Sequence, residues 1–176
     1  MIKSNRIAAA AVTLALCVAV TQAQDRKIDE KPVTDAEFVI KAASGGMFEV
    51  ESSKLAKDAA ESGEVKKFAE QMITDHEKAN KELMEAAKKA NVGLPTKMLD
   101  EHQKMLEKVQ AAKGAEFDRT YMTTQVAAHE EAVALFSNAA KNVKDPGLKA
   151  FAEKTLPVIK EHYEHAKKHD KGDTKK

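Results

Sequence analysis

Residues 65–83 read VKKFAEQMITDHEKANKEL. Apolar side chains recur in this stretch every three or four positions, and charged side chains fill the opposite positions, which is the pattern of an amphipathic α-helix. His76 lies in the middle of the apolar stripe. Other stretches of the chain show the same combination of a helical apolar stripe and one inward polar residue. Together with residues 65–83, they indicate a helical fold with a polar site in its interior.

Start and stop signals divide the surrounding sequence into four long helices and one short helix. A capping box of Thr34 and Glu37 opens the first helix, and Asp145 followed by Pro146 opens the last. Pro157 is expected to kink the last helix because proline removes one backbone hydrogen bond. The predicted helices cover residues 34–60, 64–90, 98–112, 115–143 and 145–168.

The composition also favours an all-α fold. The 176 residues include only seven glycines and four prolines, too few for the closely spaced turns of an all-β sandwich or barrel.

Short connections join the first two and the last two long helices, and the short helix lies in the crossover between the second and the third. This order predicts an up-and-down four-helix bundle over residues 34–169.

Residues 1–23 are predicted to form an export signal. Lys3 and Arg6 precede an apolar run over residues 7–20, and small residues near Ala23 suit cleavage. The apolar run is too short to span a bilayer, which takes about 20 apolar residues. We therefore expect a protein located in the periplasm or outside the cell, with no membrane span in the mature chain.

Two other interpretations of this segment are disfavoured. A buried first helix does not fit the abrupt change to polar residues after Ala23, and a lipid anchor at Cys17 does not fit the bulky Leu16 before it. Cleavage removes the single cysteine and takes the 29 basic residues to 27 against 28 acidic ones, a net charge of −1. Residues 24–33 are expected to be a flexible lead-in and residues 170–176 a disordered tail.

Each long helix turns one metal-capable side chain toward the predicted interior. These side chains are Glu49, His76, His129 and His162. Counted from the intervening turns, the first two lie at one level, and the last two differ by about one turn, roughly 5 Å. Three imidazoles and one carboxylate at mid-height predict a site for one transition-metal ion, such as zinc, copper, iron or manganese.

A purely structural polar core is the alternative. A single histidine on an apolar face is more often a hydrogen-bonded core residue than a ligand, and Glu49 could pair with a protonated histidine. Against this, a buried carboxylate without a cationic partner is costly, and no lysine or arginine lies on the inward faces. Asn80 and Gln125, each one turn from a histidine, are either hydrogen-bond partners of the site or ordinary amides between helices.

The remaining histidines and the methionines are assigned less specific roles. His102 faces the apolar side of the short helix and is expected to cap the core. His162, His165 and His169 follow one edge of the last helix, a spacing compatible with a surface metal site. The neighbouring lysines nevertheless favour solvated side chains for His165 and His169. The methionines are expected to fill the core rather than to bind copper.

Several motifs resemble one bacterial family. They are AASGG followed by EV within residues 42–50, FAEQM followed by DH within 68–76, FD at 117–118 with Tyr121 and His129, and Leu156-Pro157 with His162. This combination is similar to domain-of-unknown-function family 4142, often labelled predicted outer-membrane protein, over residues 34–168. The resemblance implies a ferritin-like four-helix bundle in the bacterial envelope and no particular reaction. The chain lacks the Glu-x-x-His pairs of di-iron bundles, so di-iron chemistry is not expected.

Three functions follow from these residues. The first is an exported bundle that binds one transition metal in its core, for storage, sensing or redox protection. The second is a non-enzymatic envelope or stress protein that binds a partner through its helical surface. The third, an enzyme with Tyr121 or Tyr163 beside a redox metal, has less support, and no catalytic residue is assigned. The net charge gives no reason to expect nucleic acid, and the partner and homo-oligomer formation are left open.

Overall fold

The computed structural model describes residues 31–170, and within that range all regular secondary structure is helical. The all-α prediction is confirmed, and each observed helix end lies within two residues of its predicted position. The predicted leader, residues 24–30 of the lead-in and residues 171–176 of the tail lie outside the described residues. The helices are α1 (Asp35–Ala59), α2 (Gly63–Lys89), α3 (Asp100–Ala111), α4 (Ala115–Asn142) and α5 (Pro146–Asp170).

The helix ends follow from the residues that the sequence places there. The Thr34 hydroxyl accepts a hydrogen bond from the Glu37 N–H at 3.2 Å, and the Glu37 carboxylate accepts one from the Thr34 N–H at 3.0 Å, which completes the capping box. Asn91 follows α2 in the left-handed region, with a φ of 55°, which asparagine tolerates. At the start of α5, the Asp145 carboxylate accepts a hydrogen bond from the Leu148 N–H at 2.9 Å.

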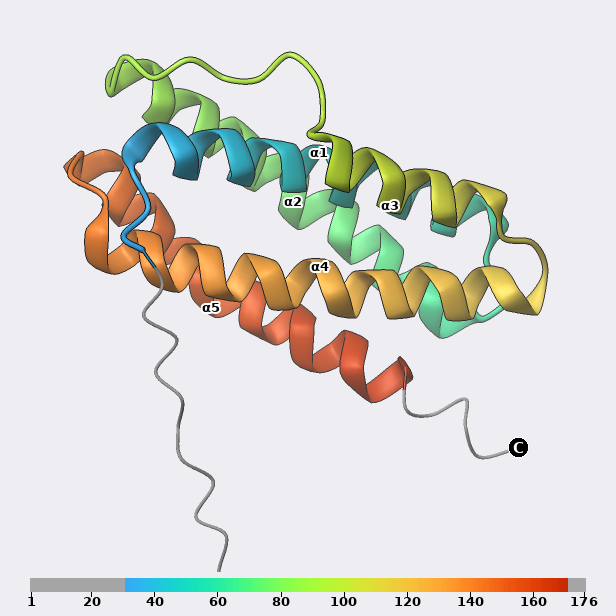
Figure 1. Cartoon of the computed structure of the whole chain (residues 1–176). Coiled ribbons are helices and arrows are strands. Elements are labelled where there is room, and N and C mark those ends of the chain that lie inside the picture. The colour runs from blue at the N-terminus through green and yellow to red at the C-terminus, as the bar shows by residue number, and fades with distance from the viewer. Residues whose placement is uncertain (1–30, 171–176) are drawn as a thin grey trace, which may run out of the picture.

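The four long helices pack as two pairs, α1 with α2 and α4 with α5, and the short helix α3 lies over α1 and α4 (Figure 1). Helix α5 continues through the exposed Pro157. Glycine permits a close approach of α1 and α2, because a Cβ atom at Gly46 would overlap the Asn80 side chain. None of the helices within residues 31–170 is both long and apolar enough to cross a membrane.

Each helix pair is anchored to the other through its turn. The Asp118 carboxylate of α4 accepts hydrogen bonds from the backbone N–H groups of Glu61 and Ser62, at 3.0 and 2.8 Å, in the turn between α1 and α2. Conversely, Asp35 of α1 accepts hydrogen bonds from two N–H groups of the turn between α4 and α5, at 2.7 and 3.1 Å. These reciprocal bonds set the position of one pair along the other.

The apolar core forms two large clusters, one toward each end of the long helices, and a small third cluster in which α1, α3 and α4 meet through Phe48, Leu106 and Ala128. The first contains Phe38, Phe136 and Phe151, whose ring centroids lie 5.1–6.2 Å apart. The second contains Phe68 and Tyr121, with centroids 6.3 Å apart. In each long helix, one residue of the predicted site lies between the members of the first cluster and those of the second; these residues are Glu49, His76, His129 and His162. Packing of the two clusters therefore brings these four positions to a common level.

Candidate metal centre

Three of the predicted site residues come together in the interior: His76 of α2, His129 of α4 and His162 of α5. One ring nitrogen of each lies within 4.8 Å of the others, and the ring centroids are 5.5–5.8 Å apart. His129 and His162 are buried, and His76 is partly buried. Three ring nitrogens in this group, His76 Nε2, His129 Nε2 and His162 Nδ1, are buried without a hydrogen-bond partner.

Hydrogen bonds on the other ring nitrogens fix two of the tautomers. His129 Nδ1–H donates to the Gln125 carbonyl oxygen at 2.9 Å, so His129 Nε2 carries a lone pair. His162 Nε2–H donates to the Asp75 carboxylate at 3.0 Å, so His162 Nδ1 carries a lone pair. An imidazole whose far N–H is held by a carbonyl or carboxylate is the usual arrangement of a metal-binding histidine.

The environment also keeps the rings neutral. Burial lowers the pKa of His129 to about 3, with a further lowering by His162. Burial lowers the pKa of His76 well below its ordinary value, and it lowers that of His162 against the opposing effect of Asp75. Because neutral imidazoles are the form that binds cations, the three lone pairs are available at pH 7 without loss of a proton.

Glu49 lies beside this group rather than among its converging nitrogens. Its Oε1 is 3.4 Å from His129 Nδ1, the nitrogen that also donates to Gln125, and its Oε2 is buried without a partner. Burial raises the pKa of Glu49 to about 8, against a smaller lowering by Gln125. The metal-free protein therefore holds a protonated carboxyl group next to a neutral imidazole at pH 7. Coordination by Glu49 stays a prediction.

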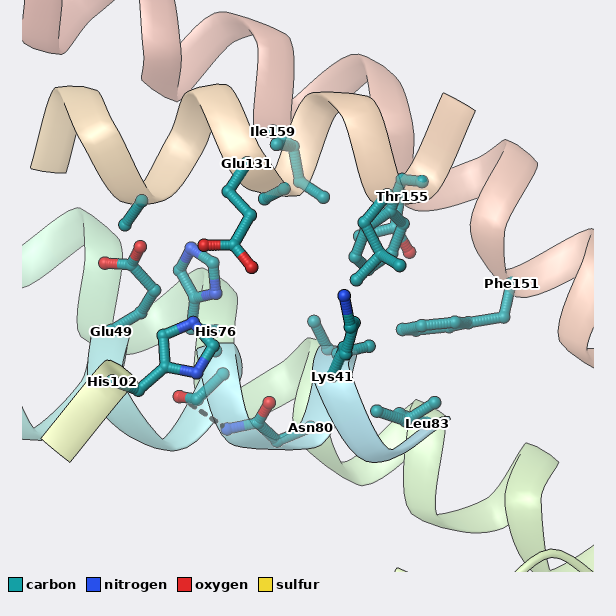
Figure 2. A pocket seen from close by; sticks show the side chains of 18 residues that line it. Lys41, Glu49, His76, Asn80, Leu83, His102, Glu131, Phe151, Thr155 and Ile159 are labelled. Carbon is teal, nitrogen blue, oxygen red and sulfur yellow. Dashed lines mark hydrogen bonds between the residues drawn. The ribbon is translucent and has the colours of Figure 1, made fainter. Parts of the chain in front are cut away.

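A cavity of about 50 Å³ adjoins the site. Glu49 and His76 line one end of it and Phe151 the other, as Figure 2 shows. Lys41 and Glu131, both exposed, extend toward it from α1 and α4 (Figure 2). The volume is enough for a few water molecules, and the lining includes both the exposed Lys41 and Glu131 and the buried Glu49.

The sequence matches the family model described as Domain of unknown function (DUF4142) over residues 18–168. The chain belongs to this family. No curated protein gives a significant match. Among solved structures, the chain is similar to CopM in the Cu(II)-bound form, with 22% identity and a TM-score of 0.67 over 80% of this chain and 98% of that one. It is similar to CopM in the Cu(I)-bound form with 22% identity and a TM-score of 0.65 over 77% and 94%. This likeness shows a shared fold.

The two amide residues that were predicted to contact the histidine cluster, Asn80 and Gln125, have different roles. Asn80 donates to the Gly46 carbonyl oxygen at 3.0 Å and joins α2 to α1, so it is an amide between helices. Gln125 belongs to the site through its carbonyl oxygen, while its side-chain amide donates to Ser52 at 3.1 Å.

The partner that sequence reasoning missed is Asp75. The Asp75-His76 pair is visible in the sequence, but Asp75 is the partner of His162 on another helix. Only the packing of α2 on α5 shows this relation. The only indication of this role in the sequence is that Asp75 is an acidic residue at the edge of the apolar stripe, next to the inward His76.

The structure agrees with the prediction for His102 but not with the prediction for His165. His102 is a satisfied core histidine, as predicted: its Nδ1 is hydrogen-bonded to Ser44 at 2.7 Å, and its ring stacks on Phe48 at 6.1 Å. His165 is not solvated as predicted. It is half-buried, and its ring stacks on Phe68 with a centroid distance of 4.7 Å.

The methionines also differ in burial, and Met98 and Met105 are half-buried against the small third core cluster. Met72 and Met122 are buried and fill the core, as expected. Met84 is 51% exposed, so the prediction was wrong for this residue. Met84 lies at a surface pocket between α1 and α2, whose lining also includes Met47 and Met98.

Proposed function

We propose that this protein binds one copper ion in its interior through His76, His129 and His162, with Glu49 as the fourth member of the site. The observation that carries the proposal is the convergence of three imidazole nitrogens from three helices, with three buried ring nitrogens left unpartnered. A buried polar atom without a partner costs about 1–3 kcal/mol. One cation would satisfy all three lone pairs at once.

The donor set favours copper among the predicted metals. Affinity for nitrogen ligands rises along the divalent series to copper, and imidazole suits copper better than manganese. The shared fold with CopM, whose solved forms hold Cu(I) or Cu(II), supports the same choice. When bound, copper supplies a positive charge and one-electron redox chemistry.

The protein groups around the imidazoles have separate tasks. Asp75 and the Gln125 carbonyl orient two of the rings. Glu49 would supply a compensating negative charge by releasing its proton when a cation lies nearby. Lys41 and Glu131 flank the cavity that would give access to the site.

The polar-core alternative has less physical support. An ion pair of Glu49 with a charged histidine is disfavoured because burial lowers the pKa of His129 to about 3, and a neutral polar core leaves three buried ring nitrogens without a hydrogen-bond partner. The proposal includes a ferritin-like bundle exported by residues 1–23 to the periplasm. Its role is binding of the metal, for storage, sensing or redox protection, rather than catalysis.

Elemental analysis after metal loading tests the proposal. The metal-free protein is mixed with excess Cu²⁺ and passed through a desalting column equilibrated with free histidine, which removes weakly held ions. We expect about one copper per chain to remain, the stoichiometry of a single closed site. Retention of no copper, with zinc and iron also absent after the same treatment, would leave the polar core as the better explanation.

Asp75→Asn is expected to lower the copper affinity about 10- to 100-fold, the usual effect of removing a partner that orients a ligand. The amide keeps the shape but loses the charge that stabilises the His162 N–H. Competition against a chromophoric chelator measures the change. Glu85→Gln removes an exposed charge from the same helix and serves as the control. Equal affinities for both variants would contradict the role of Asp75.

A further inference from the structure

The last turns of α5 carry two histidines that the proposed copper site does not use. His165 and His169 are four residues apart, so their side chains lie on the same face of the helix. Their ring centroids are 4.6 Å apart. Both side chains are half-buried rather than enclosed. This arrangement brings two partly exposed imidazoles together on one face of α5.

Phe68 of α2 contacts both His165 and the buried His162. The rings of Phe68 and His165 stack with an interplanar angle of 21°. The same Phe68 ring meets His162 edge-on, with a centroid distance of 6.4 Å. His165 Nδ1 is buried and has no hydrogen-bond partner. His165 is therefore pre-positioned by an aromatic contact while its Nδ1 makes no protein hydrogen bond.

The charges around the pair are mixed and do not exclude a cation. Glu64 of α2 acts on His165 with negative charge, and Lys168 acts on it with positive charge. The nearby Lys167 ammonium is engaged elsewhere, at 2.6 Å from the Glu164 carboxylate. Both acidic and basic side chains therefore lie around this end of α5.

We propose that His165 and His169 form a second metal site, which takes a divalent ion that prefers imidazole, such as Cu²⁺ or Zn²⁺. Two protein ligands leave the remaining coordination positions to water, so this site is weaker than a site of three buried imidazoles and exchanges its ion with solvent. It goes beyond the proposed function and does not depend on occupancy of the buried cluster.

Calorimetric titration of the metal-free protein with Cu²⁺ tests this site. We expect two classes of binding in the wild type, one tight and one weaker, each of about one ion. His169→Ala is expected to remove the weaker class and to leave the tight one. Lys160→Ala, which replaces an exposed lysine earlier on the same helix, is the matched control and should retain both classes. Circular dichroism checks that α5 remains folded in each variant.

The outcomes separate the two sites. Only one class in the wild type, or a weaker class that persists in His169→Ala, would overturn the second site and leave the buried site intact. A weaker class that His169→Ala removes, without any tight class, would support the second site and contradict the proposed function. As an independent readout, Zn²⁺ should shift the imidazole C–H proton resonances of His165 and His169 at concentrations above those that saturate the tight class. Unshifted resonances would overturn the assignment.

Discussion

Replacing His129 with leucine is expected to abolish tight copper binding and to leave the metal-free protein at least as stable as the wild type. His129 is fully buried and has an unpartnered Nε2. Its loss removes one of three imidazoles, so the affinity should fall by more than the roughly 100-fold upper effect of losing an orienting partner. Leucine removes the unpartnered Nε2 at this position, and the Gln125 carbonyl that accepts from His129 Nδ1–H keeps its helical partner, the backbone N–H of residue 129, so stability should be unchanged or higher.

Copper titration and thermal unfolding of the same sample measure the two effects. His102→Leu is the matched control, because His102 is also a buried histidine but lies outside the cluster and is hydrogen-bonded to Ser44. We expect this control to keep the copper affinity and to lose about 1–3 kcal/mol of stability, because the Ser44 O–H then lacks its buried acceptor while the Ser44 oxygen still accepts from the Leu99 N–H. Retention of wild-type copper affinity by His129→Leu would exclude the histidine cluster as the binding site.

Glu49→Gln is expected to gain stability relative to the wild type as the pH rises from about 5 to 8, in the absence of metal. Burial raises the pKa of Glu49 from 4.5 to about 8. Between these two values the folded protein binds a proton that the unfolded chain releases, so the wild-type stability contribution of this group falls as pH rises. The difference should grow by about 1.4 kcal/mol per pH unit, the slope for one proton. Above the folded-state pKa the difference levels off.

Urea unfolding of both proteins at several pH values measures this difference, and the other titrating groups cancel because the two chains share them. Glu51→Gln, two positions along α1, changes an exposed carboxylate and should show no such slope. A constant difference between the wild type and Glu49→Gln over this pH range would mean that Glu49 is ionised in the folded protein throughout. The proposed proton release on metal binding would then fail as well.

The sequence was most informative where the physics is local. The capping box at Thr34 and the proline start of α5 depend on neighbouring residues, and both were predicted correctly. The inward direction of the histidines follows from helical periodicity, so their shared location was also predictable. Counting residues predicted an offset of about one turn, roughly 5 Å, between His129 and His162, and their ring centroids lie 5.6 Å apart. Side-chain reach accommodates such an offset.

Features that depend on which helices pack together were not predictable. Asp75 and His162 are 87 residues apart in sequence, and no periodic pattern on one helix indicates their hydrogen bond. The stacking of His165 on Phe68 also requires α2 beside α5. Lysines around His165 suggested exposure, but the aromatic neighbour comes from a different part of the chain. The cavity beside Glu49 likewise arises from the assembled helices alone.

The reciprocal turn anchors at Asp35 and Asp118 have a consequence for how the molecule assembles. Each hairpin of two helices leaves backbone N–H groups at its turn that only a carboxylate of the other hairpin engages. The three histidines are likewise divided, with His76 in the first hairpin and two in the second. Neither half of the chain can therefore form the site on its own. Two halves produced separately should form the histidine cluster only when they associate, and copper should then favour their association.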